Sequence, residues 1–158
     1  MAHRVLRLLG YAFLAATVAL LIAINLLQSL EGVVIVAVVS GRSMYPVLRT
    51  GDIVFVIPRQ VCGEISVGDV IVYRDTANEL IIHRVIAVER CGNETYFRVK
   101  GDNNPIEDYY KYVACPLNSE IRGIPESRVA GKVLSIAGAV LKIPYLGLIK
   151  LSGFAGLS

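Results

Sequence analysis

The sequence predicts a mostly β protein in which an N-terminal transmembrane helix precedes a compact β-rich domain. Three observations support this fold class. An uncharged apolar run extends from Leu8 to Leu30. Beyond it the pattern changes to short β-branched runs separated by Gly, Pro and Asn turns, which is typical of antiparallel sheets. Apolar residues make up 54% of the 158-residue chain, enough to fill the core of one domain.

Residues 1–31 are predicted to form a short cytoplasmic stub and a membrane anchor. The 23 residues from Leu8 to Leu30 contain no Asp, Glu, Lys or Arg. A helix of that length measures about 35 Å, which is enough to cross a bilayer core. No small-residue cleavage motif follows the run, so we expect an uncleaved anchor. Arg4 and Arg7 favour a cytoplasmic N-terminus, with the following domain outside the cell membrane. A long buried helix of a soluble protein is the alternative.

Residues 32–134 are predicted to form the β-rich domain. The expected strands cover residues 33–39, 53–57, 70–73, 79–89, 95–100 and 129–134. A hairpin turn is expected from Cys91 to Glu94, and a loop over residues 102–110. These strands are short and follow one another closely, which favours antiparallel pairing.

Residues 135–158 form an apolar tail that the sequence describes less clearly. We expect this tail to lie at the membrane surface or to form a second membrane segment. Lys142 and Lys150 interrupt the apolar pattern and disfavour a clean span.

Charge and cysteine content limit the possible partners. The net charge of +3 is spread along the chain without a basic stripe, which argues against nucleic acid as a partner. Cys62, Cys91 and Cys115 all fall on the expected external side, where disulfides persist. Their spacing matches no zinc motif. The odd number leaves at least one thiol without a partner in the chain, and the pairing is open.

Ser43 is a candidate nucleophile because it lies on a sharp turn. It follows a predicted strand and precedes Met44 and Pro46, a sequence that exposes the hydroxyl. Serines in turns usually only form the turn, so Ser43 alone predicts little.

His83 is the only histidine that can reach Ser43, since His3 precedes the anchor. Strand alternation places His83 on the same face as Ile81 and Val85. A buried histidine held by one hydrogen bond is the simpler interpretation. The functional interpretation is a general base, because imidazole changes its protonation near neutral pH.

Two aspartates follow in the loop after the fifth predicted strand. Asp102 and Asp108 are both able to orient an imidazole, and their spacing does not choose between them. Glu107 is a weaker third option. Aspartates in such loops also cap backbone amides, which is the structural alternative.

Together these motifs resemble those of type I signal peptidases, the membrane-anchored serine proteases that remove signal peptides from exported proteins. The matching segments, in family order, are residues 41–52, 68–73, 82–86, 101–108 and 131–133. Each segment is weak evidence, but the ordered set is specific. Histidine at the position where bacterial members carry lysine points to the archaeal and endoplasmic-reticulum branch. The short chain favours an archaeal member.

The resemblance implies that Ser43 is the nucleophile and His83 the general base. It favours Asp108 as the carboxylate that orients His83, with Asp102 supporting the loop or the site. Many members carry a serine where this chain has Gly41, and that hydroxyl helps to bind the oxyanion. A backbone amide, that of Ser43, is therefore expected to contribute more here. No metal or cofactor is implied.

The implied reaction is hydrolysis of a peptide bond through an acyl-enzyme. The implied substrates are secretory preproteins with small residues at the first and third positions before the cut. They would be met at the surface of the membrane lipid, in the neighbourhood of the protein-export machinery. We expect the strand at 33–39 to pair with the extended substrate by edge addition.

Three alternatives remain open. The chain could be a catalytically silent subunit that binds signal peptides within a processing complex, although it retains all four candidate residues. It could be a membrane-tethered β module for adhesion or assembly, for which Ser43 would be dispensable. It could also be a self-cleaving repressor-type protease, which shares a related core but uses Ser-Lys chemistry.

Overall fold

The computed structural model describes residues 2–31, 34–108, 112–115, 118–146 and 155–157. The chain divides into two units, Met1–Val33 and Val34–Ser158. The first unit contains helix α1 (Ala2–Glu31), which is rich in the strong helix formers Ala and Leu. Among the described residues it is the one helix long and apolar enough to cross a membrane, over His3–Ile24 with a mean hydropathy of 2.2.

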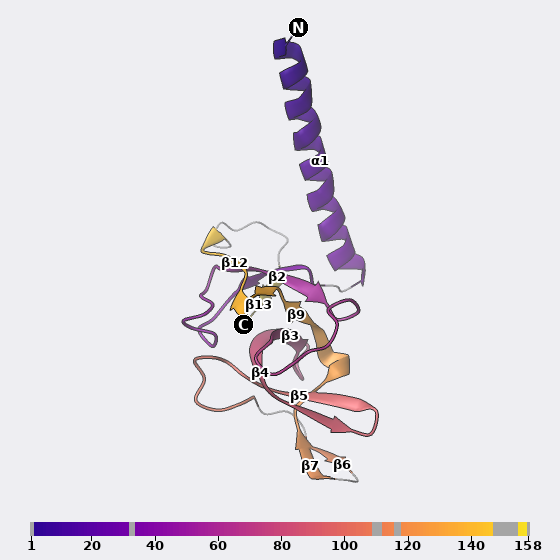
Figure 1. The fold of residues 1–158 in the computed structure, drawn as a ribbon, viewed down its shortest axis with the longest axis vertical. Coiled ribbons are helices and arrows are strands. Elements are labelled where there is room, and N and C mark those ends of the chain that lie inside the picture. Colours follow the sequence, from indigo (N-terminus) through magenta and orange to yellow (C-terminus); the bar gives the residue numbers. More distant parts are fainter. Residues whose placement is uncertain (1, 32–33, 109–111, 116–117, 147–154, 158) are drawn as a thin grey trace. The chain divides into compact units, whose positions relative to one another are not determined.

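The second unit is built on an antiparallel sheet (Figure 1). Within its described residues the strands are β1 (Val36–Val39), β2 (Ile53–Pro58), β3 (Val70–Arg74), β4 (Leu80–Cys91), β5 (Glu94–Lys100), β6 (Tyr112–Cys115), β7 (Asn118–Arg122), β8 (Ile124–Pro125), β9 (Val129–Val133), β10 (Ser135–Ile136), β11 (Ala139–Val140), β12 (Lys142–Ile143) and β13 (Ala155–Leu157). A 3-10 turn, η1 (Glu126–Arg128), precedes β9.

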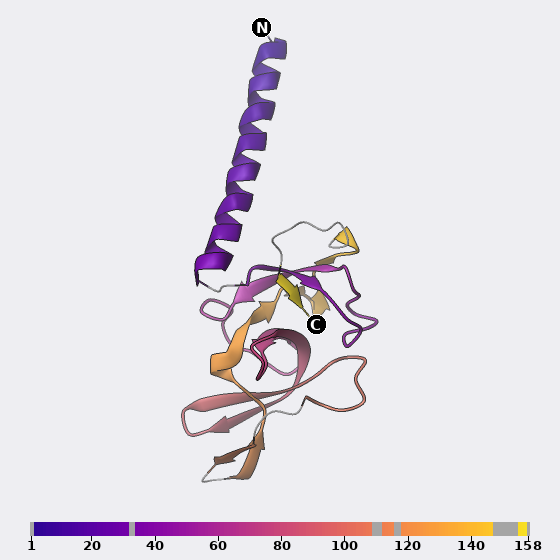
Figure 2. The same cartoon turned by 180° about the vertical axis from the view of Figure 1, so that it is seen from behind.

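Nine of the described strands form one sheet in the order β13-β1-β2-β9-β3-β4-β5-β8, with β12 also paired to β2. Its pairs are antiparallel, apart from the parallel pair β1–β13. Strands β3 and β4 curl at the centre of this unit in both views (Figures 1 and 2). The curl is accompanied by a bulge at Ile86, where the register of β4 against β5 shifts, since bulges increase local strand twist.

The predicted fold class, mostly β with an N-terminal apolar helix, is confirmed. Each of the six predicted strands has a counterpart, and the 33–39 strand is shorter, beginning at Val36. The sequence analysis missed the hairpin β6–β7 and the short strands β8 and β10 to β13. Residues 109–110 of the predicted loop lie outside the described residues.

Two hydrophobic cores lie on opposite sides of β3. Val70 and Val72 pack into one core with Met44 and Leu48, whereas Ile71 and Tyr73 pack into the other. Strand β3 is therefore buried on both faces, which explains its continuous run of apolar residues. The register then decides which core each residue of β4 meets.

The tail contributes strands to the sheet. Lys142 and Ile143 pair with β2, and Ala155 to Leu157 pair with β1. The edge of β1 at which substrate pairing was expected is therefore covered by β13 in this structure. Contact between the tail and a membrane stays a prediction, and residues 147–154 lie outside the described residues.

The structure describes the side chains of two of the three cysteines. Cys62 is a free thiol, and Cys91 is disulfide-bonded. The side chain of Cys115 lies outside the part of the chain that the structure describes, so the partner of Cys91 is not assigned.

Candidate functional site

Ser43 lies on the turn between β1 and β2, and that turn is held from both ends. Gly41 has a φ of 98°, a conformation that a serine adopts only with strain, which accounts for glycine at this position. The Thr50 hydroxyl donates to the Gly41 carbonyl (2.7 Å) and accepts from the Gly41 N–H (3.1 Å). Met44 and Leu48, buried on either side of the turn, anchor it in the core. Ser43 itself is half-buried.

The loop after β5 binds directly to the Ser43 turn. The Asn103 N–H donates to the Ser43 carbonyl (2.7 Å), and Asn103 Nδ2 donates to the Arg42 carbonyl (3.2 Å). A Cβ at Gly101 would lie 2.6 Å from the backbone carbonyl oxygen of Ser43, so only glycine permits this close approach of the two segments. The position of the serine is therefore coupled to the conformation of the loop that carries both candidate aspartates.

His83 lies on β4, directly opposite Ile71 of β3. Its side chain is 6% exposed, on the same face of the sheet as the second core. The Nδ1 atom contacts Oδ2 of Asp108. The Nε2 atom is buried and has no hydrogen-bond partner among the described residues, so Ser43 Oγ does not bond to it in this structure. The imidazole thus has one nitrogen fixed by a carboxylate and one nitrogen open.

Asp108 is held by two further groups. Its N–H donates to the carbonyl of Val99 on β5 (2.9 Å), and its Oδ2 accepts a hydrogen bond from the Tyr73 hydroxyl (2.5 Å). Tyr73 was missed in the sequence analysis as a site residue. The alternation of β3 offered the signal, because Tyr73 lies two residues beyond Ile71 and so shares the face that meets His83.

Asp102 pairs with Arg84 and not with His83. Its two carboxylate oxygens accept hydrogen bonds from Nε and NH2 of Arg84, each at 2.7 Å. Arg84 also donates to the Gly68 carbonyl (2.8 Å). Glu107, the third option, makes a similar pair with Arg98, with both bonds at 2.8 Å. Of the three acidic residues considered, the structure brings Asp108 alone to the imidazole.

A fourth acidic group, Asp52, anchors the end of the Ser43 turn to the tail. It is fully buried and accepts hydrogen bonds from Lys142 Nζ (2.6 Å) and the Arg49 N–H (3.0 Å). Burial by itself would raise the pKa of Asp52, but these bonds and one from the Tyr145 N–H outweigh it and hold that pKa below its usual value. Lys142, which made a membrane span doubtful in the sequence, therefore binds a buried carboxylate.

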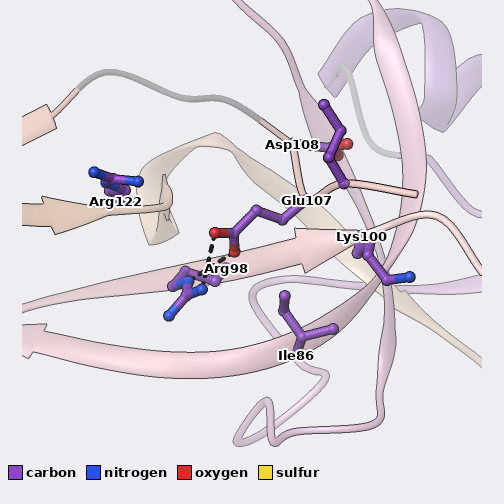
Figure 3. A pocket seen from close by; sticks show the side chains of 7 residues that line it. Ile86, Arg98, Lys100, Glu107, Asp108 and Arg122 are labelled. Atoms are coloured by element: carbon purple, nitrogen blue, oxygen red, sulfur yellow. Dashed lines mark hydrogen bonds and ion pairs between the residues drawn. The ribbon is translucent and has the colours of Figure 1, made fainter. Parts of the chain in front are cut away.

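Asp108 also lines a pocket of about 480 Å³ (Figure 3). Its lining combines three cationic, two acidic and two apolar side chains, those of Ile86, Arg98, Lys100, Ile106, Glu107, Asp108 and Arg122. Lys100 donates to the Asn104 carbonyl (2.9 Å). No group of three or more His, Cys, Asp or Glu side chains within the described residues is placed to hold a metal ion.

The arrangement has the parts of a hydroxyl-activating site. A half-buried serine lies on a rigid turn. A buried histidine has an Nε2 without a hydrogen-bond partner in the described part of the chain, and a carboxylate fixes its Nδ1. Such a set permits general-base activation of the serine, because the carboxylate stabilises the imidazolium that forms.

The chain is similar in sequence to known signal peptidases. The chain is 38% identical to the signal peptidase complex catalytic subunit sec11 of Neurospora crassa over 81 residues, which are 51% of this chain and 46% of the relative. It is 35% identical to signal peptidase I W of Bacillus subtilis over 77 residues, 49% of this chain and 40% of the relative. The chain thus spans less than half the length of these relatives.

A family model confirms the relationship. The model described as Peptidase S24-like matches residues 16–115, more than half of the chain, and this match includes Ser43, His83, Asp102 and Asp108. The resemblance to type I signal peptidases stated from the sequence is confirmed by the relatives. On this evidence the chain belongs to the Peptidase S24-like family.

Proposed function

We propose that this protein is a membrane-anchored serine endopeptidase that removes N-terminal signal peptides from exported preproteins. The observation that carries the proposal is the contact of Asp108 with His83 Nδ1, made by the same loop that binds the Ser43 carbonyl. The names of the two relatives supply the substrate class. Helix α1 supplies a segment suited to membrane anchoring.

In this proposal Ser43 Oγ attacks the scissile carbonyl while His83 Nε2 takes its proton. Asp108 stabilises the imidazolium, and His83 then donates the proton to the leaving amine. Water attacks the resulting ester on Ser43 and releases the signal peptide. The Ser43 hydroxyl must come within hydrogen-bond reach of Nε2 during the reaction, because Nε2 has no partner among the described residues in the resting structure.

The oxyanion is proposed to bind to a backbone N–H at the Ser43 turn. Gly41 has no hydroxyl to offer, and its backbone is fixed by Thr50. The N–H of Ser43 is the donor we assign, because the turn is already rigid and needs no reorganisation during the reaction. Ser40 is exposed and remains a second donor in the proposal.

The alternative in which a lysine activates the serine receives no support from the described lysines of the β-rich domain. Lys100 Nζ binds the Asn104 carbonyl, Lys132 Nζ lies 3.2 Å from Asp69, and Lys142 Nζ lies 2.6 Å from Asp52. Each of these ammonium groups is therefore paired with a residue other than Ser43. The buried base on β4 is His83 instead.

The experiment is cleavage of a labelled preprotein by the detergent-solubilised full chain, with the cut mapped by mass spectrometry. We expect cleavage at a single site after a small residue, and loss of that cleavage in Ser43→Ala. Equal cleavage by both proteins would contradict the assigned nucleophile. A correctly folded wild type that binds the signal peptide without cutting it would instead identify a silent subunit of a processing complex.

A further inference from the structure

Two donors converge on one oxygen of Asp108. The Tyr73 hydroxyl donates to Oδ2 at 2.5 Å, and His83 Nδ1 contacts that same Oδ2. The two rings lie side by side, with centroids 6.4 Å apart and planes inclined at 55°. Tyr73 comes from β3 and His83 from β4, so the paired strands fix both donors relative to each other.

Burial prevents water from replacing the tyrosine. Tyr73 is 3% exposed and belongs to the second hydrophobic core, with Ile71 and Val85. Burial, and then the hydrogen bond to Asp108, raise the pKa of Tyr73 above its usual value, so the hydroxyl keeps its proton. A buried hydroxyl that remains protonated is a permanent donor to the carboxylate.

We propose that Tyr73 is a positioning residue of the reaction: its hydroxyl fixes the Asp108 carboxylate and keeps the proton on His83 Nδ1 while the imidazolium exists. The inference rests on the proposed function. With the carboxylate held in this way, the Nδ1–H of the imidazolium keeps Oδ2 as its hydrogen-bond acceptor. The imidazolium therefore keeps its Nδ1 proton and delivers the Nε2 proton to the leaving amine. Tyr73 does not touch substrate in this scheme.

The first test compares Tyr73→Phe with Tyr96→Phe. Tyr96 is a matched control, because it is also buried and its hydroxyl donates to a carboxylate, that of Glu94 on the same strand. We expect Tyr73→Phe to lower kcat by about 10- to 100-fold with KM unchanged, the scale of a hydrogen bond to a charged group. Tyr96→Phe should leave kcat within about twofold. An unchanged kcat in Tyr73→Phe overturns the inference.

A double-mutant cycle separates positioning from general destabilisation. In an Asp108→Asn background, Tyr73→Phe should cause little further loss in single-turnover rate, because its target is already changed. The same fold-loss in both backgrounds would overturn the inference. Thermal unfolding of each variant checks that the proteins compared are folded.

A readout besides activity distinguishes failure of the inference from failure of the proposed function. The chain has two histidines, so the Nδ1 proton resonance of His83 is assigned by comparison with His83→Ala. Tyr73→Phe should move this resonance, and Tyr96→Phe should not. An unmoved resonance overturns the inference even if the wild type cleaves preprotein. If Tyr73→Phe moves the resonance but the wild type does not cleave preprotein, the contact with Asp108 stands and the proposed function is refuted.

Discussion

His83 and Arg84 are neighbours on β4, yet each binds a different aspartate of the same loop in a different manner. His83 meets Asp108 through one nitrogen in a buried setting, and its other nitrogen has no partner among the described residues. Arg84 meets Asp102 through two parallel hydrogen bonds and uses a third nitrogen on the Gly68 carbonyl.

The comparison shows that two aspartates of one loop are held in two different arrangements. The Arg84 pair is closed, since its donors are used in fixing the loop, and bidentate pairs of this type give geometric specificity. The His83 pair is open, since Nε2 has no hydrogen-bond partner among the described residues and, in the proposed mechanism, takes the proton of Ser43. We therefore expect loss of the His83 pair to remove activity, and loss of the Arg84 pair mainly to remove stability.

The largest expected effect is on the open pair. Asp108→Asn should lower the rate of preprotein cleavage by about 10⁴-fold, the scale seen when the orienting carboxylate of a catalytic triad is replaced. His83→Ala should lower it by about 10⁶-fold, the scale seen when the general base is removed. Their melting temperatures should stay close to that of the wild type. Unfolding in parallel with loss of activity would make the His83 pair structural and erase the contrast with Arg84.

The ion pair between Asp52 and Lys142 offers a purely structural standard. Lys142→Met would leave a fully buried carboxylate without its cation, which should cost about 3–5 kcal/mol of the free energy of unfolding. Chemical denaturation of wild type and variant measures this difference. A change below about 0.5 kcal/mol would show that the tail is not anchored by this pair.

The same pair predicts a pH dependence of stability. The pKa of Asp52 is lowered in the folded state, so its pairing stabilises the fold above about pH 4 and this contribution is lost as pH falls through the folded pKa. In Lys142→Met, the ammonium group no longer opposes the effect of burial on Asp52, so burial favours the protonated form of this carboxyl group. The stability gap between the two proteins should therefore narrow below about pH 4, and a gap that widens would contradict the assignment.

A smaller effect on stability is expected from the closed pair. Asp102→Asn should lower the free energy of unfolding by about 1.5–3 kcal/mol, because it weakens hydrogen bonds to a charged guanidinium. Glu107→Gln is a suitable control, since it alters a similar pair with Arg98. That pair does not involve Arg84, the residue next to His83 on β4. Cleavage should fall less than in Asp108→Asn. A larger loss in Asp102→Asn would reverse the roles assigned to the two aspartates.

The smallest effect concerns the edge of β1. Strand β13 pairs with β1, so an extended substrate would need to displace it in order to pair at that edge. Deleting residues 147–158 should therefore lower KM by less than about tenfold. The deletion should leave kcat unchanged, because Ser43 and His83 are untouched. A raised KM would mean that the tail assists binding.

The sequence was sufficient for the apolar helix and for the six strands β1 to β5 and β9. Choosing between Asp102 and Asp108 requires the path of the loop, which depends on the register of β4 against β5 and on the approach of Gly101 to Ser43. Neither feature is visible in residue spacing. The same applies to Tyr73, whose face on β3 was predictable but whose hydroxyl partner was not.

The tail was least predictable, for a physical reason. Strands β10 to β12 are two residues long, too short to produce a periodic pattern, and they depend on pairing with one another or with β2. Lys142 was recognised only as an obstacle to a membrane span. Its partner Asp52 lies far away in sequence, and a buried carboxylate with a distant cation leaves no local pattern.

The most direct test of the account is to trap the acyl-enzyme. The full chain would be mixed with excess preprotein, quenched in acid at short times, digested and examined by mass spectrometry. The account predicts a transient ester adduct on the peptide that contains Ser43, absent in Ser43→Ala and reduced in Asp108→Asn. An adduct on another residue, or cleavage that persists in Ser43→Ala, would contradict it.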